Sequence, residues 1–124
     1  DGARPLVSRA IIEEAARLCR EWEAVAVAVP VKSTIKRVGG KDLCVEETLK
    51  RDGLWEVQTP QAFQRDILEK AHAQNTDDNP TDDAVMVERL GVKVKIIRGD
   101  YANIKITTRE DLVIAECILK GAPR

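Results

Sequence analysis

Residues 25–31 read Val-Ala-Val-Ala-Val-Pro-Val, an apolar run without a charged side chain. A short run that is apolar at every position is typical of a strand covered on both faces, as in parallel sheets flanked by helices. Pro30 has no backbone N–H to donate, so it marks the end of this strand. The run therefore predicts a buried strand of an α/β protein.

A helix is predicted just before this strand, with Ser8 as its N-cap and an end near Trp22. Apolar side chains recur along it with the helical period and should share one face: Ile11, Ile12, Ala15, Leu18, Cys19 and Trp22.

Residues 32–58 predict a protruding β-arm. Two short runs, 34–38 and 43–48, flank a glycine-bearing loop at 39–42, which is the pattern of a hairpin. This segment has too few large apolar residues to hold a core of its own. We therefore expect the arm to pack on a partner subunit.

The remaining segments continue an α/β alternation. Pro60, which suits the first turn of a helix, predicts a helix to about Asn75. After a polar loop, further elements are predicted: a helix capped by Thr81 that runs to Leu90 and is ended by Gly91, a strand at 92–98 near a sheet edge, a short strand or turn at 103–106, and a helix to about Lys120. Thr108 and Asp111 resemble a capping box at the start of that last helix.

Composition limits the class of protein. A length of 124 residues can hardly hold two domains, and we expect residues 1–124 to be the C-terminal portion of a single domain, within which 32–58 is the arm. A formal net charge of -1, with both signs mixed along the chain, argues against a nucleic-acid partner. We also expect no membrane association, because no apolar run reaches the roughly 18 residues that a span requires.

The cysteines and the histidine give little indication of a disulfide, a zinc site or a catalytic triad. Cys19, Cys44 and Cys117 have no Cys-x-x-Cys spacing, so we expect neither a disulfide framework nor a zinc site. Cys19 and Cys117 lie in apolar helical stripes and should be buried. His72 is the only histidine and lies among polar residues, which indicates a surface position rather than a triad.

The first residues, Asp1-Gly2-Ala3-Arg4-Pro5, suit the mouth of a strand where the backbone approaches a ligand. We expect the chain to be the later part of a longer enzyme. Asp1 is a candidate Mg²⁺ ligand, since Mg²⁺ prefers one or two carboxylates together with phosphate oxygens. The alternative is a strand-end Asp bonded to backbone amides.

Threonines and cations at element boundaries indicate an anion site. The candidates are Arg51, Lys105, Thr59, Thr81 and Thr107 or Thr108. Hydroxyls, helix-start amides and a fixed cation together suit a phosphate ester. In the alternative interpretation the threonines only cap helices and the cations are solvated.

Other boundary residues favour structural roles. Asp82 and Asp83 are either a second acidic site or, with more support, first-turn acids that favour the helix dipole. Trp55 and Phe63 are expected to be packing anchors.

Taken together, the motifs resemble the 2-C-methyl-D-erythritol 4-phosphate cytidylyltransferase family over essentially the whole chain. The matching segments are Asp1-Gly2-Ala3-Arg4-Pro5, 29–36 (Val-Pro-Val-Lys-Ser-Thr-Ile-Lys), 51–55 (Arg-Asp-Gly-Leu-Trp), 58–63 (Gln-Thr-Pro-Gln-Ala-Phe), 81–84 (Thr-Asp-Asp-Ala) and 103–107 (Asn-Ile-Lys-Ile-Thr). The resemblance implies the C-terminal portion of a Rossmann-like nucleotidyltransferase fold, a three-layer αβα arrangement in which the β-arm forms a homodimer.

The resemblance also implies roles for residues. Asp1, Gly2 and Ala3 would bind CTP, with Asp1 helping to hold Mg²⁺. Thr34 and Arg51 would reach from the arm into the partner's site. Thr59, Thr81 and Lys105 would complete the polyol-phosphate pocket, with Lys105 also near the reacting phosphates and therefore catalytic.

Two departures from the family pattern matter. The family's glycine-rich CTP loop belongs to an N-terminal half that this sequence does not contain, so this chain alone should be inactive. Ala102 stands where some members carry an Asp that contacts the polyol. Alternatives are a ribitol-5-phosphate cytidylyltransferase, which shares fold and mechanism, and a non-catalytic dimerisation fragment. We expect a cytoplasmic bacterial protein and leave a plastid location open.

Overall fold

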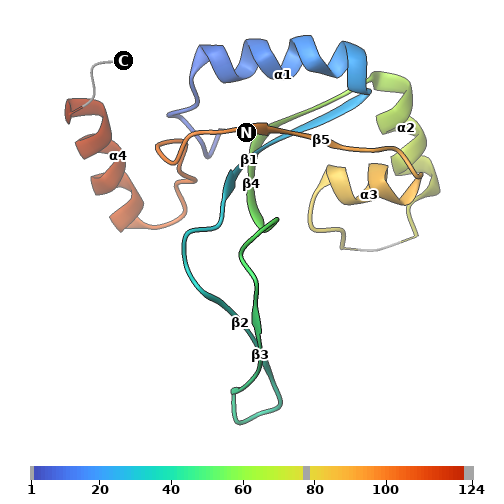
Figure 1. Cartoon of the computed structure of the whole chain (residues 1–124). Helices are drawn as coiled ribbons and strands as arrows, with labels where there is room; N and C mark the ends of the chain where they lie inside the picture. Colours follow the sequence, from blue (N-terminus) through green and yellow to red (C-terminus); the bar gives the residue numbers. More distant parts are fainter. Residues whose placement is uncertain (1, 77–78, 122–124) are drawn as a thin grey trace.

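The computed structural model of the chain describes residues 2–76 and 79–121 (Figure 1). Its helices and strands follow in the order α1 (Arg9–Trp22), β1 (Ala24–Pro30), β2 (Ile35–Gly39), β3 (Cys44–Leu49), β4 (Trp55–Phe63), α2 (Arg65–Gln74), α3 (Asp83–Arg89), β5 (Lys95–Arg98) and α4 (Arg109–Gly121). A three-stranded sheet has the order β4-β1-β5, and β2 pairs with β3 separately. β1 is parallel to β5 and antiparallel to β4, so the sheet is mixed rather than purely parallel.

β1 is covered on both faces, as its apolar run predicts. Successive side chains of a strand point to opposite faces. Val25 and Val27 pack with Ile11, Ala15 and Cys19 of α1. On the other face, the neighbouring Ala24 packs with side chains of α2 and α3: Ala71, Met86 and Val87. Helices on both sides of the sheet give the three layers (Figure 1).

α1 confirms the predicted helix, and the Oγ of its N-cap Ser8 accepts from the Ile11 N–H at 3.3 Å. The predicted apolar face is too wide, since the Ile12 and Trp22 side chains are 47% and 41% exposed. Only the stripe that faces β1 is buried. Burial raises the pKa of the Cys19 thiol within that stripe.

The helix predicted to start at Pro60 is wrong. Thr59 and Pro60 lie inside β4, and the helix that follows begins at Arg65 and ends at Gln74. β4 pairs Gln61 with Ala26 and Val57 with Ala28, and the register shifts in between. Residues 58–60 thus oppose a single residue of β1 in a bulge. A proline is tolerated there because its missing N–H breaks no regular ladder bond.

Other helix and strand boundaries differ by a few residues from those predicted from the sequence. The cap of α3 is Asp82, not Thr81, because the Asp82 Oδ1 accepts from the Val85 N–H at 2.9 Å. β5 begins at Lys95 rather than at residue 92, and it lies at one edge of the described sheet, as expected. Residues 103–106 form no strand.

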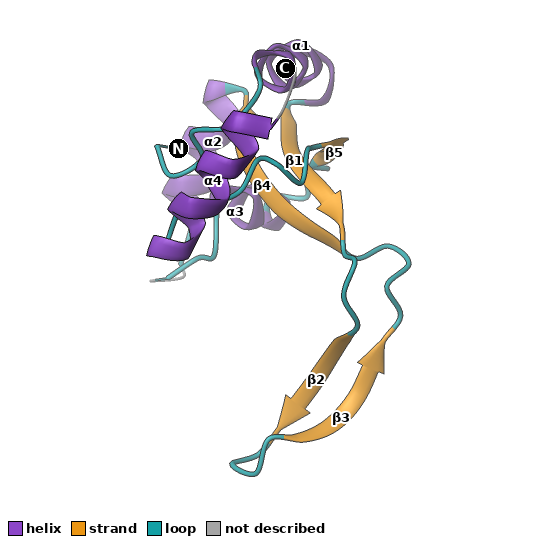
Figure 2. Ribbon diagram, turned by 90° about the vertical axis from the view of Figure 1, so that its left-hand side faces the viewer, coloured by secondary structure: helices purple, strands orange, loops and turns teal. Residues whose placement is uncertain are grey.

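The arm is confirmed as a hairpin that projects from the body (Figure 2). Gly40 has φ +68° in the connecting loop, a conformation that favours glycine. Arg37 and Glu47 form an exposed ion pair of 2.8 Å across the two strands. The exposed apolar side chains of β2, β3 and the loop between them include Val38, Leu43 and Val45.

α4 lies apart from the sheet and makes few contacts with the other described elements (Figure 1). Ala115 is buried, whereas several large apolar side chains are exposed: Leu112, Val113, Ile114 and Leu119. Cys117 is exposed as well, so its predicted burial is wrong. No helix in the described part of the chain is long and apolar enough to span a membrane.

The capping box of α4 is confirmed. The Asp111 N–H donates to Thr108 Oγ1 at 3.3 Å, and the Thr108 N–H donates to Asp111 Oδ2 at 2.8 Å. The backbone N–H and the hydroxyl of Thr107 donate to the same carboxylate oxygen. These hydrogen bonds, led by the two backbone amides, lower the pKa of Asp111.

Acidification should therefore loosen the start of α4. A carboxyl whose pKa is depressed by folding stabilises the fold above its unfolded pKa of about 3.9. That contribution is lost as the pH falls through the lower, folded pKa of Asp111. We expect the hydrogen-exchange protection of the Thr107 and Thr108 amides to fall in this range, with the Ser8-capped amide of Ile11 as control. An equal loss at both helix starts would contradict the prediction.

Candidate functional site

The candidate site lies where the parallel strands β1 and β5 end, the edge at which ligands bind in open α/β sheets. The segment after β5 turns back across β4, and the first residues of the chain run beside it. The Ile106 N–H donates to the Ala3 carbonyl at 2.7 Å. Arg4 Nη1 donates to the Asn103 carbonyl at 2.6 Å. Segments distant in sequence therefore meet at one edge.

Two cavities at this edge share several lining residues, among them Arg4, Gln58 and Lys105. The first, of about 280 Å³, is lined by Arg4, Val57, Gln58, Thr59, Gln61, Thr81, Asp82 and Lys105. The second, of about 260 Å³, is lined by Arg4, Val29, Glu56, Val57, Gln58, Tyr101, Asn103, Ile104 and Lys105. Lys105 therefore borders both cavities.

The structure brings Thr59, Thr81 and Lys105 to the same cavity, although they are far apart in sequence. The Lys105 side chain is exposed, and its ammonium has no hydrogen-bond or ion-pair partner within residues 2–76 and 79–121. An unpaired cation beside hydroxyls can bind phosphate oxygens through charge-assisted hydrogen bonds. The cavity has the chemistry expected of an anion site.

Thr34 and Arg51 line neither cavity of their own copy. Thr34 is exposed just before β2, and the Arg51 guanidinium donates to the Lys32 carbonyl at the base of the arm. Thr107 and Thr108 belong to the cap of α4. Gly2 is exposed beside Ala3, whereas Asp1, the candidate metal ligand, lies outside the described residues.

Arg4 was not singled out from the sequence, although it lies within the quoted first motif. Its Nη1 and Nη2 donate to the Asn103 and Val57 carbonyls at 2.6 and 3.5 Å. Desolvation by burial lowers the pKa of Arg4, but a guanidinium stays charged at neutral pH. Arg4 therefore brings a fixed positive charge to both cavities.

Gln61 and Asp82 were also not assigned to the site by sequence reasoning. Gln61 Nε2 donates to Asp82 Oδ2 at 2.9 Å, which joins β4 to the start of α3. The following residue, Asp83, pairs with the partly exposed His72 at 2.9 Å, so His72 is a surface residue as predicted. The two aspartates thus have structural partners, which favours the first-turn interpretation over a second acidic site.

The described residues do not form a metal cage. No group of three or more His, Cys, Asp or Glu side chains suited to a metal occurs in the described segments. The nearby Asp82 and Asp100 carboxylates both accept hydrogen bonds from backbone amides. A metal held mainly by a ligand's phosphate oxygens would need only one or two carboxylates.

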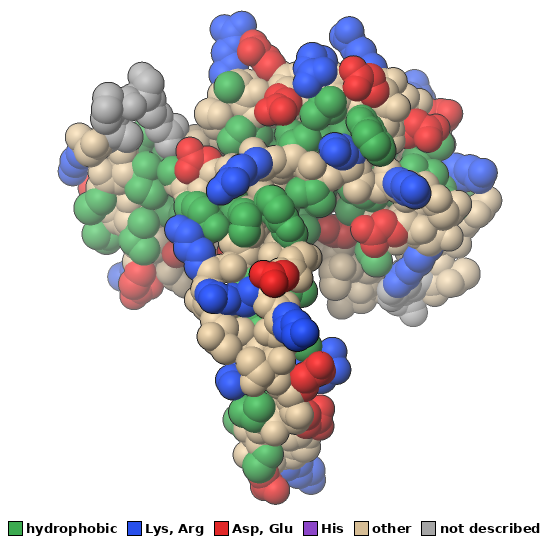
Figure 3. Space-filling view, viewed as in Figure 1, with side chains coloured by type: hydrophobic (Ala, Val, Ile, Leu, Met, Phe, Trp, Pro, Cys, Tyr) green, Lys and Arg blue, Asp and Glu red, His purple; other side chains and the backbone are tan. Residues whose placement is uncertain are grey.

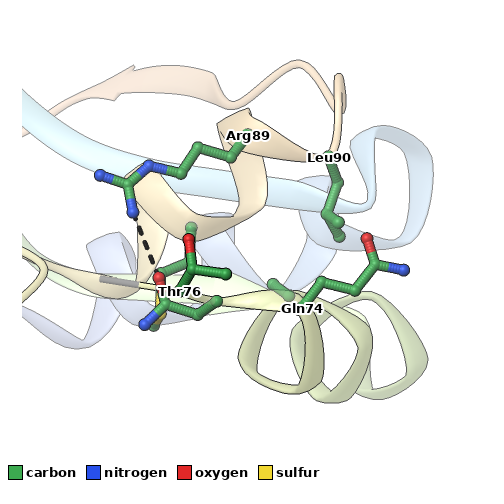
Figure 4. A pocket seen from close by; sticks show the side chains of 7 residues that line it. Gln74, Thr76, Arg89 and Leu90 are labelled. Carbon is green, nitrogen blue, oxygen red and sulfur yellow. Dashed lines mark hydrogen bonds between the residues drawn. The ribbon is translucent and has the colours of Figure 1, made fainter. Parts of the chain in front are cut away.

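A separate cavity of about 170 Å³ lies between α2 and α3 (Figure 4). Arg89 Nη1 donates to Asn75 Oδ1 at its rim, at 3.2 Å. The lining residues are Ala71, Gln74, Asn75, Thr76, Met86, Arg89 and Leu90. No residue predicted for the functional site is among them.

The fold and the site have the features of α/β proteins that bind phosphate esters. The family model described as IspD, 2-C-methyl-D-erythritol 4-phosphate cytidylyltransferase, matches residues 1–121, and the chain belongs to this family. The resemblance drawn from the motifs is thereby confirmed.

Curated relatives with that name agree. One from Caldanaerobacter subterraneus subsp. tengcongensis is 51% identical over 122 residues, which cover 97% of this chain and 53% of the relative. One from Alkaliphilus oremlandii is 54% identical, with 97% and 51% covered. The chain spans about half the length of the curated relatives it matches.

Solved structures give the same result. The 4-diphosphocytidyl-2C-methyl-D-erythritol synthase of Anaerococcus prevotii superposes with a TM-score of 0.85 at 34% identity, covering 97% of this chain and 54% of that one. The 2-C-methyl-D-erythritol 4-phosphate cytidylyltransferase of Thermus thermophilus has a TM-score of 0.82 at 31% identity, with 95% and 58% covered. The chain therefore has part of the Rossmann-like nucleotidyltransferase fold of these enzymes.

Proposed function

We propose that the full-length protein containing this chain couples CTP with 2-C-methyl-D-erythritol 4-phosphate, forming 4-diphosphocytidyl-2-C-methyl-D-erythritol and pyrophosphate. Membership of the cytidylyltransferase family supports this reaction. The observation that carries it is the convergence of Thr59, Thr81 and Lys105 on one cavity. Because the relatives are about twice as long, the activity is assigned to the full-length protein.

The reaction requires positioned anions more than a reactive side chain. A phosphate oxygen of the polyol phosphate attacks the α-phosphorus of CTP, the bond from that phosphorus to the β-phosphate oxygen breaks, and pyrophosphate leaves. Such a transfer depends on alignment and on cations near the developing charge. The described site supplies cations and hydroxyls, and two of its nearby acids, Asp82 and Asp100, are already hydrogen-bonded to backbone amides.

We assign a role in this reaction to each candidate site residue according to the cavity that it borders or the segment on which it lies. Lys105 borders both cavities and is free to bind phosphate oxygens, so we assign it to charge stabilisation at the α-phosphate. Thr59 and Thr81 are assigned to the polyol phosphate. Gly2 and Ala3 would approach the nucleotide with their backbone, since Ala3 is bonded to Ile106 next to Lys105.

A divalent metal, Mg²⁺, belongs to the proposal as well, with Asp1 as its protein ligand. The absence of a metal cage among the described side chains is compatible with an ion held largely by the triphosphate. Such an ion would neutralise phosphate charge when bound.

The arm is proposed to complete the site of a partner subunit in a homodimer. Thr34 and Arg51 line neither of the two cavities at the candidate site of their own copy, and the arm projects away from the body (Figure 2). Its exposed Val38, Leu43 and Val45 offer apolar surface for a second copy. Arg51 suits a phosphate monoester because its planar guanidinium can bind two oxygens at once.

This chain alone is proposed to be inactive. Hydrophobic side chains gather over α4 and in a band above the base of the arm (Figure 3). The exposed set includes Trp55 and Val57 of β4, Ile96 of β5, and Leu112 and Val113 of α4. An exposed apolar surface of this kind suits contact with further protein. The remaining half is also expected to carry the glycine-rich CTP loop.

Pyrophosphate release tests the proposed function. The full-length protein is assayed with CTP, Mg²⁺ and either 2-C-methyl-D-erythritol 4-phosphate or ribitol 5-phosphate. We expect efficient turnover only with the former, and no turnover by the 124-residue chain. Faster turnover of ribitol 5-phosphate would refute 2-C-methyl-D-erythritol 4-phosphate as the substrate. Pyrophosphate release by the 124-residue chain would refute the proposal that this chain alone is inactive.

A further inference from the structure

Asn103 is a buried polar residue that joins separate parts of the site. Its side chain is 1% exposed. Its Nδ2 donates to the Thr59 carbonyl at 2.9 Å and to Gln58 Oε1 at 3.2 Å. Its own carbonyl accepts from Arg4 Nη1 at 2.6 Å. A buried amide costs free energy unless it is hydrogen-bonded, so these bonds hold Asn103 against β4.

Gln58 completes a pair of buried amides that we call the amide clasp, formed by Gln58 and Asn103. The Gln58 side chain is 6% exposed, and its Nε2 donates to the Asp100 carbonyl at 2.9 Å. Gly99 permits this close approach, because a Cβ there would collide with the Gln58 amide and lie 2.7 Å from Val27 Cγ1. The clasp therefore fastens the segment after β5 to β4.

The clasp fixes the backbone of Lys105 from one side. Asn103 lies two residues before Lys105, and the Ile106 N–H, one residue after it, is bonded to the Ala3 carbonyl at 2.7 Å. The Lys105 ammonium has no partner of its own in the described part of the chain. Its location relative to the cavities is consequently set by the backbone that carries it.

We propose that Asn103, with Gln58, is a positioning residue that holds Lys105 where charge develops during nucleotidyl transfer. This inference rests on the proposed function. An error of about 1 Å in the placement of a reacting group can reduce a rate on the order of a hundredfold. Loss of the clasp should therefore lower kcat even though Asn103 does not itself touch the reacting atoms.

The test is a double-mutant cycle of Asn103→Asp and Lys105→Ala in the full-length protein. Asn103→Asp keeps the size of the side chain but removes both donated hydrogen bonds. We expect kcat to fall on the order of a hundredfold, with the KM for CTP within about twofold of wild type. In the Lys105→Ala background, Asn103→Asp should change kcat little. If Asn103→Asp lowers kcat by the same factor in the wild-type protein and in Lys105→Ala, the proposal is overturned.

A matched control separates positioning from general stability. Val87→Ala removes buried side-chain volume in the core between α2, α3 and β1, away from both cavities. It should lower the melting temperature and leave kcat unchanged. If Asn103→Asp does not fold, Gln58→Glu, which removes only the bond to the Asp100 carbonyl, takes its place in the cycle with the same expected pattern.

Hydrogen exchange distinguishes failure of this inference from failure of the proposed function. If the wild-type protein shows no turnover, the proposed function fails, and exchange of residues 100–107 then tests the clasp alone. Faster exchange of this segment in Asn103→Asp, with α2 unchanged, supports the clasp. Unchanged exchange of residues 100–107 overturns it.

Discussion

Lys105→Ala in the full-length protein should lower kcat by about a hundredfold to a thousandfold, the usual effect of deleting one group that stabilises transition-state charge. Lys105 borders both cavities, and no described residue neutralises its ammonium. The KM values should change less than kcat, because the interaction is strongest when charge builds on the α-phosphate.

Steady-state kinetics with CTP and 2-C-methyl-D-erythritol 4-phosphate measure this effect. Lys70→Ala is the matched control, since it removes an exposed lysine of α2 that lines neither cavity. Lys105→Arg, which keeps the charge but alters its shape, should retain part of the rate. An unchanged kcat in Lys105→Ala would limit this lysine to ground-state binding.

A heterodimer of one Arg51→Ala subunit and one Lys105→Ala subunit should recover activity that neither homodimer has. If the arm completes the partner's site, one of the two sites combines an intact Lys105 with an intact Arg51. Two-fold symmetry then predicts about half of the wild-type activity for the purified heterodimer. The structure motivates the test because Arg51 lies at the base of the arm and lines neither cavity of the candidate site in its own copy.

Two different affinity tags on co-expressed subunits allow the heterodimer to be isolated. The control heterodimer pairs Lys105→Ala with Thr59→Ala. Both substitutions fall on the same cavity of the body, so each of its sites keeps one defect and activity should stay low. Equal activity of the two heterodimers would refute a role for the arm in the partner's site.

Elements of the fold could be predicted from the sequence where a single local pattern, such as an apolar run or a helix cap, determines the structure. The apolar run at β1, the Ser8 cap of α1 and the Thr108–Asp111 box of α4 were all predicted correctly. Each depends on contacts between residues that are close in sequence, or on burial that any apolar strand requires. The predicted helix start at Thr59 and Pro60 was wrong because a proline suits both the first turn of a helix and a bulge. Only the pairing of β4 with β1 decides between the two.

The candidate site was predicted only in part. Thr59, Thr81 and Lys105 were recognised as chemically suitable, and they line one cavity. Asn103 and Gln58 begin two of the quoted family motifs, but nothing in the sequence indicated their role, since a buried amide looks like any other polar residue in a sequence. Their importance depends on hydrogen bonds between residues 45 positions apart.

The amino-acid sequence by itself determined the α/β class, the hairpin arm, the family and the hydroxyls and cation suited to a phosphate ester. Only the tertiary structure decided that residues 4, 59, 81 and 105 share a cavity and that two amides fasten the loop carrying the lysine. The physical reason is the range of the interactions. Local periodicity and capping act within a few residues, whereas cavities and buried hydrogen bonds exist only after distant strands have paired.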